Sequence, residues 1–305
     1  MTTISIALLV LGIALAGPGS RLLASARWPG RDPVGALVLW QAVGLASGLS
    51  LLGAGVTYGL SPLAGSLLPA VEAFWHNTLA LRPWAGLRGP HLAVLAATAV
   101  LGGRLVGVLL AATVRTLLAR RRHRHMIDVL TTPWPDRPGA RVLDHPLPVA
   151  YCLPGLRSRV VVSTGALDQL DRDQLDAVLA HERAHLAERH DLVVLPFVAW
   201  GTALPWSAGV RRSQFAVASL IEMRADDRAR SECGAAELAA AVRTVEGGAA
   251  RTPITFAAAA ASRIARLEAA DPPMPRAARF AVRLAALALV AVPTAVLMLG
   301  LWPLA

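Results

Sequence analysis

The stretch that decides the fold runs from Asp171 to Asp191 and has the sequence DRDQLDAVLAHERAHLAERHD. Its apolar residues recur at helical spacing, which indicates a helix with one buried face. Asp171 is followed three residues later by Gln174, a variant of the capping box that begins many helices. We therefore predict one helix over residues 171–191.

This predicted helix contains His181-Glu182-Arg183-Ala184-His185. Residues four apart share one helical face, so both imidazoles can reach one zinc ion. Glu182 projects beside them, where it can take a proton from a water that the metal activates and pass it to a leaving amine. The pattern predicts a zinc-dependent metalloendopeptidase with His181 and His185 as ligands and Glu182 as the catalytic base. The alternative is a solvated helix face that happens to carry two histidines.

A catalytic zinc site needs a third protein ligand. Residues 219–228 are typical of a second helix, in which Glu222 and Asp226 lie four apart on one face. We expect Glu222 to be the third ligand. Asp226 is expected to accept a hydrogen bond from a ligating histidine and so fix its ring. His190 is a weaker ligand candidate, because it lies five residues past His185 and partly off the ligand face.

Two runs rich in apolar and β-branched residues, Pro148–Leu153 and Arg159–Ser163, flank Pro154-Gly155 and predict a β-hairpin. Zinc proteases commonly bind a substrate as an added strand, so the hairpin is either that substrate-binding edge or a small structural ribbon. Tyr151 in the first strand, together with His190, is a candidate for contacting the substrate or the oxyanion.

The composition indicates a membrane protein, since 55% of the 305 residues are hydrophobic and the mean hydropathy is +0.51. The apolar residues gather in long blocks with little charge, which is typical of transmembrane helices. We predict an α-helical membrane protein with about four such helices and an inserted α+β zinc protease domain at residues 115–279. The predicted spans are residues 4–23, 34–60, 92–114 and 284–305.

The charge distribution gives an orientation. All 30 basic residues are arginine and the net charge is +10. Arginines crowd the loop between the first two spans and both ends of the polar domain, and cytoplasmic loops carry such an excess. We therefore expect a multi-pass protein of the cell membrane with a cytoplasmic protease domain and both termini outside. The run Arg120–Arg124 favours a membrane anchor over a nucleic-acid site.

Several features of the apolar segments carry further expectations. Residues 192–210 have no charge, yet both predicted site helices must meet at one ion, so we expect this segment to dip into the bilayer or pack against the spans rather than cross. Arg104, in the middle of a span, should face the bundle or a wet cavity, or else snorkel. Glycines four apart in the second span permit close helix packing or merely reflect the frequency of glycine in membrane helices; these are Gly44/Gly48 and Gly55/Gly59. The two cysteines, Cys152 and Cys233, are expected to be buried thiols.

These features together resemble the BlaR/MecR family of antirepressor membrane metallopeptidases. Three spans precede the protease domain, Val-Val-Val-Ser-Thr-Gly-Ala-Leu leads into Leu-Ala-His-Glu-Arg-Ala-His-Leu, and Glu-Met-Arg-Ala-Asp and a fourth span follow. The resemblance covers nearly the whole chain. It implies a gluzincin-type fold, with Zn²⁺ bound by His181, His185 and Glu222, Glu182 as the base and Asp226 in support. It also implies a signal-activated protease that cleaves itself or a winged-helix transcriptional repressor.

The β-lactam sensors of that family carry a penicillin-binding domain after the fourth span, whereas this sequence ends at Ala305. We therefore expect sensing to use the loop at residues 61–90, the spans or a partner protein, or else the chain has no sensor. The expected partners are a protein substrate and membrane lipids, with no direct nucleic-acid binding; a homo-oligomer is left open. Two alternatives are a housekeeping membrane protease of the HtpX type and a catalytically inactive transducer.

Overall fold

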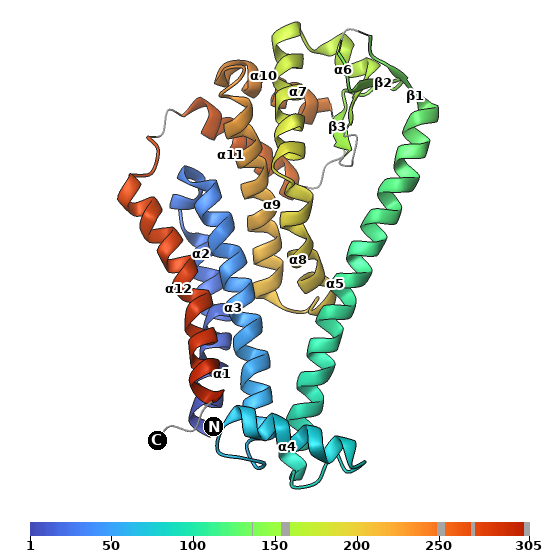
Figure 1. The fold of residues 1–305 in the computed structure, drawn as a ribbon. Coiled ribbons are helices and arrows are strands. Elements are labelled where there is room, and N and C mark those ends of the chain that lie inside the picture. The colour runs from blue at the N-terminus through green and yellow to red at the C-terminus, as the bar shows by residue number, and fades with distance from the viewer. Residues whose placement is uncertain (136, 154–158, 249–253, 270–271, 302–305) are drawn as a thin grey trace.

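The computed structural model describes residues 1–135, 137–153, 159–248, 254–269 and 272–301, and it is mostly helical with one small sheet (Figure 1). Its first part contains α1 (Thr2–Ala14), a π-helical turn (Leu15–Gly19), α2 (Ser20–Ser25), a 3-10 turn (Trp28–Arg31), α3 (Pro33–Leu60), α4 (Leu67–Leu79) and α5 (Gly89–Leu130). The strands follow as β1 (Thr131–Pro133), β2 (Ala140–Leu143), β3 (Ala150–Leu153) and β4 (Arg159–Ser163). The remaining helices are α6 (Thr164–Gln169), α7 (Arg172–Ala187), α8 (His190–Ala203), α9 (Ala208–Ala229), α10 (Ala235–Gly248), α11 (Ile254–Glu268) and α12 (Arg276–Leu301).

Four helical segments in the described part of the chain are long and apolar enough to cross a membrane: Thr2–Ser25, Pro33–Leu60, Gly89–Leu130 and Arg276–Leu301. They correspond to the four predicted blocks, but two extend further. The third continues to Leu130 and the fourth begins at Arg276 rather than at residue 284. Arginine is a good helix former, so a helix continues where the apolar run stops. The start of α1, the end of α12 and α4 lie at one end of the molecule, and the sheet, α7 and α10 lie at the other (Figure 1).

Residues 192–210 form most of a helical hairpin made of α8, a short turn and the start of α9. The hairpin packs against the long helices, α8 on α5 and α9 on α3, as expected. Arg104 of α5 donates from Nε to the carbonyl of Ala203 at 2.9 Å, so it faces the bundle and binds a carbonyl left free at the end of α8. Arg104 lies in the middle of the apolar block 92–114. The tip of the hairpin is therefore level with the middle of that block.

The glycines of α3 permit close packing. A Cβ on Gly55 would clash with Thr98 of α5, and a Cβ on Gly59 would come within 3.0 Å of Leu95. Gly48 faces the ring of Trp200 on α8 in the same way, at 3.1 Å. The close-packing interpretation of these three glycines is confirmed.

The sheet has the order β1-β2-β4-β3, which leaves β3 at an edge. β3 and β4 pair antiparallel with Ala150 opposite Val162, so the predicted hairpin is confirmed, although its first strand begins at Ala150 rather than Pro148 and Pro154-Gly155 lie outside the described residues. Successive strand residues face opposite sides of a sheet. Val160 and Val162 accordingly pack in a core with α7, while Val161 packs with Ile127 at the end of α5.

The helix that carries the motif begins as predicted and ends early. Asp171 and Gln174 make both hydrogen bonds of the capping box. The prediction that the helix continues to residue 191 is wrong, because Arg189 adopts a left-handed conformation with φ of 53° and a new helix begins at His190. The second site helix is longer than predicted, since α9 starts at Ala208 instead of near Ser219.

Candidate metal centre

The three predicted ligands meet at one point. His181 and His185 come from α7 and Glu222 comes from α9, which packs against it. The two Nε2 atoms are 3.0 Å apart, and the Glu222 carboxylate lies 3.4 Å from His181 Nε2 and 3.5 Å from His185 Nε2. One donor atom from each residue lies within 4.8 Å of the other two. Two imidazoles and one carboxylate form the donor set of many catalytic zinc sites, so this cluster fits a zinc ion.

Asp226 supports His181 from behind. Its Oδ1 lies 3.0 Å from His181 Nδ1, which directs Nε2 toward the cluster. Asp226 is 1% exposed, and a buried carboxylate needs a charged partner. Arg263 of α11 supplies it by donating from Nε and Nη2 to the two carboxylate oxygens at 2.8 and 2.7 Å. Arg263 Nη1 also lies 3.1 Å from Glu222, so one arginine holds both acidic residues that α9 directs to the cluster.

His190 supports His185 in a similar way and is not placed as a ligand. Its Nδ1 lies 2.9 Å from His185 Nδ1, and its Nε2 lies 3.3 Å from Glu188, which is paired with Arg224. For His185 to offer the Nε2 lone pair, its proton must be on Nδ1, which then donates to His190 Nδ1. The His190 proton is then on Nε2 and is donated to Glu188. The Arg224–Glu188 pair thus fixes the tautomers of both histidines.

Glu182 shares a cavity of about 130 Å³ with His181, Glu222 and Arg263. Ala150 of the edge strand β3 forms part of the wall, and apolar residues of α10 complete it, including Leu238, Ala241, Val242 and Val245. The thiol of Cys152, also on β3, interacts with the Glu182 carboxylate. The cavity therefore places the predicted base, the ligand cluster and a strand edge side by side.

Residues 117–269 match the profile of peptidase family M48. The chain belongs to this family. Searches among curated proteins and solved structures found no significant match. The matched M48 region falls within the polar domain predicted at residues 115–279 and contains every residue of the cluster, so the domain is a metallopeptidase.

The structure does not bring Tyr151 to the site of the M48 domain. Strand alternation turns its ring to the other face of the sheet, where it packs with Ile127 and lies 5.8 Å from the His123 ring. The candidate role of Tyr151 at the oxyanion is therefore wrong for this arrangement. His190 faces the back of His185 instead of the substrate side.

Sequence reasoning missed four supporting residues: Cys152, Glu188, Arg224 and Arg263. Arg263 lies 37 residues beyond Asp226 on another helix. No spacing rule connects the two positions, because they meet only when α11 packs on α9. Glu188 is nearer to the motif, and its position three residues past His185 was the one available signal.

The metal-free site is strongly polarised. Burial disfavours a charged His181, but the hydrogen bonds to Asp226 and Glu222 outweigh burial and raise its pKa to about 9. Burial lowers the pKa of His185 to about 4. Burial disfavours the Glu222 carboxylate as well, but His181 and Arg263 outweigh it and hold the pKa at about 2. At neutral pH His181 therefore carries a second ring proton and is positively charged.

Zinc must displace that proton. We expect the apparent zinc affinity of the metal-free protein to rise about tenfold per pH unit from pH 7 and to level off near pH 9, because raising the pH removes the competing proton from His181. His185 is already neutral across this range. Competition against a chromophoric chelator at several pH values measures this slope. In Asp226→Asn the plateau should begin at a lower pH, because Asp226 is one of the groups that raise the pKa of His181. A wild-type affinity that does not change above pH 7 would contradict the assignment of the competing proton to His181.

The support of His185 can be tested separately. We expect His190→Ala to weaken zinc binding about 10- to 100-fold, as losses of such outer hydrogen bonds do, without unfolding the domain. The same chelator competition measures the change. His76→Ala, an exposed histidine on α4, is the matched control and should bind zinc as the wild type does. Equal affinity in all three proteins would exclude the supporting role.

Proposed function

We propose that this chain is a membrane-embedded zinc metalloendopeptidase with a regulatory role, which cleaves a cytoplasmic transcriptional repressor, itself, or both in response to a signal. One observation carries the proposal: His181, His185 and Glu222 converge on one point, and the cavity at this cluster also contains Glu182 and is walled in part by the edge strand β3. Ligands, base and a strand edge are the parts that hydrolysis of an extended peptide requires.

Zinc, when bound, supplies a Lewis acid that polarises the peptide carbonyl and lowers the pKa of water to about 7. Glu182 takes the proton of the attacking water and returns it to the leaving amine. Burial raises the pKa of Glu182, which makes it a better proton acceptor than an exposed carboxylate. Arg263 keeps Glu222 and Asp226 ionised and in place while this proton moves.

The substrate is proposed to bind as an added strand on β3. An edge strand presents unpaired backbone groups that can bond an extended peptide. The cavity beside Ala150 is small and lined by apolar residues of α10 such as Leu238 and Val242, so it suits a small apolar side chain next to the scissile bond.

The four long apolar helices support a place in the membrane. The arginines of α12 and the run Arg120–Arg124 of α5 lie toward the end of the molecule that holds the sheet and the metal cluster. The positive-inside bias therefore supports a cytoplasmic protease domain, with both termini outside.

The regulatory role rests on the resemblance to antirepressor peptidases, in which the hairpin, the zinc motif and the Glu-Met-Arg-Ala-Asp segment follow in the same order. A housekeeping role is the second candidate. The two differ in their products: a regulatory protease makes a discrete cut in one folded protein, and a housekeeping protease degrades unfolded chains.

Metal removal tests the proposal. We expect the full chain, purified in detergent, to contain about one zinc ion and to cleave itself or an added winged-helix repressor at a discrete site. A strong chelator should abolish cleavage and added zinc should restore it. Degradation of unfolded casein without a discrete cut would favour the housekeeping role. Absence of both zinc and cleavage would support an inactive transducer instead.

A further inference from the structure

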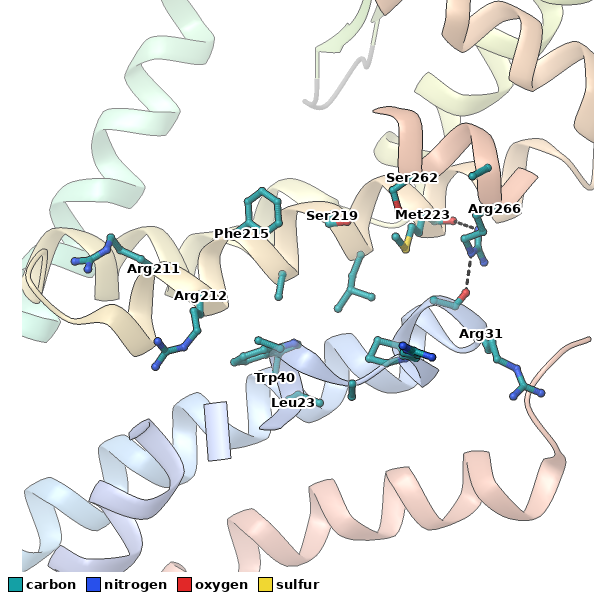
Figure 2. A pocket seen from close by; sticks show the side chains of 18 of the residues that line it. Leu23, Arg31, Trp40, Arg211, Arg212, Phe215, Ser219, Met223, Ser262 and Arg266 are labelled. Carbon is teal, nitrogen blue, oxygen red and sulfur yellow. Dashed lines mark hydrogen bonds between the residues drawn. The ribbon is translucent and has the colours of Figure 1, made fainter. Parts of the chain in front are cut away.

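A larger cavity than the one at the metal cluster also borders α9. It has a volume of about 960 Å³ and runs between α2, the following turn and α3 on one side and α9 and α11 on the other (Figure 2). We call it the back groove. Its apolar walls include Leu23, Trp40, Phe215, Leu220 and Met223. Phe215 is 58% exposed, a large apolar surface without a partner in the described structure.

The back groove is also strongly basic. Among the described residues no acidic side chain lines it. Five arginines do: Arg27, Arg31, Arg211, Arg212 and Arg266. Arg266 is neutralised by Asp227 at 2.8 Å and also donates to the carbonyl of Gly30. Arg27 and Arg212 make no ion pair within the part of the chain that the structure describes. Nε of Arg212 is buried and has no hydrogen-bond acceptor there. The groove therefore presents net positive charge, including one buried donor, to a ligand that enters it.

The depth of the groove indicates what kind of anion fits. Gly209, at the tip of the α8–α9 hairpin, packs against the backbone of Ala16, in the middle of the first long helix. Arg212 lies one turn beyond Gly209 and points toward the α2–α3 side near Trp40, whereas Arg211 points the other way (Figure 2). Arg31 and Arg266 lie at the other end of the groove (Figure 2). The groove thus extends from the middle of the apolar helices to their arginine-rich end.

We propose that the back groove binds one anionic phospholipid. Arg27 and Arg31 hold its phosphate, one acyl chain lies along Trp40 and Phe215, and Arg212 donates to an ester carbonyl below the phosphate. This inference rests on the membrane location proposed above, and it does not depend on peptidase activity. An extended acidic peptide suits the groove less well, because its walls are helices whose backbone groups are already bonded and offer no strand edge.

The groove and the metal cluster share two helices. α9 directs Glu222 and Asp226 to the cluster and Met223 to the groove, and α11 directs Arg263 to the cluster and Arg266 to the groove. A lipid in the groove therefore contacts the two helices that carry the buried Arg263–Asp226 pair. We expect bound lipid to stabilise the docking of α11 on α9.

Native mass spectrometry of the full chain in neutral detergent tests the proposal, with phosphatidylglycerol and phosphatidylcholine as probes. We expect one phosphatidylglycerol to bind first, and its affinity to fall roughly thirtyfold in Arg27→Ala/Arg212→Ala, because each of the two arginines contributes about 1 kcal/mol to binding an anionic headgroup. Neither side chain forms an ion pair with a described residue, so the variant should fold. The charge-matched control is Arg21→Ala/Arg276→Ala, two exposed arginines outside the groove, which should keep the wild-type preference.

Thermal unfolding gives a second measurement. Phosphatidylglycerol should raise the Tm of the wild type and the control, and should raise that of the groove variant less. Equal binding of the two lipids, or equal loss in both double variants, would overturn the proposal. If glycerol phosphate alone displaces phosphatidylglycerol, the groove is a site for free phosphate. If an acidic helical peptide displaces it, the groove binds a protein partner. Either result rejects the lipid proposal. All binding is measured again in Glu182→Gln, so a failed peptidase cannot be mistaken for a failed lipid site.

Discussion

Replacing Glu182 by glutamine is expected to reduce cleavage by about 10²- to 10⁴-fold while zinc binding stays at the wild-type level. The amide keeps the shape of the side chain but cannot accept the proton of the attacking water. Glu182 is absent from the ligand cluster, which consists of His181, His185 and Glu222, so its replacement leaves the donor set intact. Initial rates of discrete cleavage, with zinc measured by mass spectrometry, check both parts.

The matched control for this variant is Asp173→Asn, which removes one exposed acid from the first turn of the same helix. It should cleave as the wild type does. Loss of zinc from Glu182→Gln would mean that Glu182 binds the metal, and full activity of that variant would remove it from the mechanism.

Replacing Arg263 by alanine is expected to destabilise the protease domain by about 3–5 kcal/mol, because it removes the guanidinium that pairs with both oxygens of the buried Asp226 carboxylate and leaves that carboxylate only its contact with His181. Asp226 is 1% exposed and Arg263 donates to both of its oxygens. The control is the exposed pair of Arg243 and Glu268, which joins α10 to α11 as the Arg263–Asp226 pair joins α11 to α9. Arg243→Ala should cost less than about 1 kcal/mol.

Urea unfolding in a fixed detergent, followed through the helical signal, measures both losses. The double variant Arg263→Met/Asp226→Leu removes the buried charges together and should recover much of the stability lost in Arg263→Ala, although not the support of His181. Similar losses in Arg263→Ala and Arg243→Ala would show that the Arg263 pair is not the buried link that its geometry indicates.

The sequence predicted features that depend on local spacing. Histidines four apart on a helix must share a face, so the convergence of His181 and His185 followed from the chain itself. The capping box at Asp171 and the β3–β4 hairpin are also local, and they were confirmed. The long apolar blocks predicted membrane-spanning helices, because an apolar run of about 20 residues with little charge is long enough to cross a bilayer as a helix.

The tertiary structure decided what depends on chain segments meeting. Arg263, 37 residues from Asp226, becomes its partner only when α11 packs on α9. His190 changed from a candidate ligand to a support because Arg189 breaks the helix and turns α8 in a new direction. Tyr151 lies away from the site because the pairing of β3 with β4 sets which strand residues face α7. Periodicity places a residue on a face of its own element, and packing alone decides what that face meets.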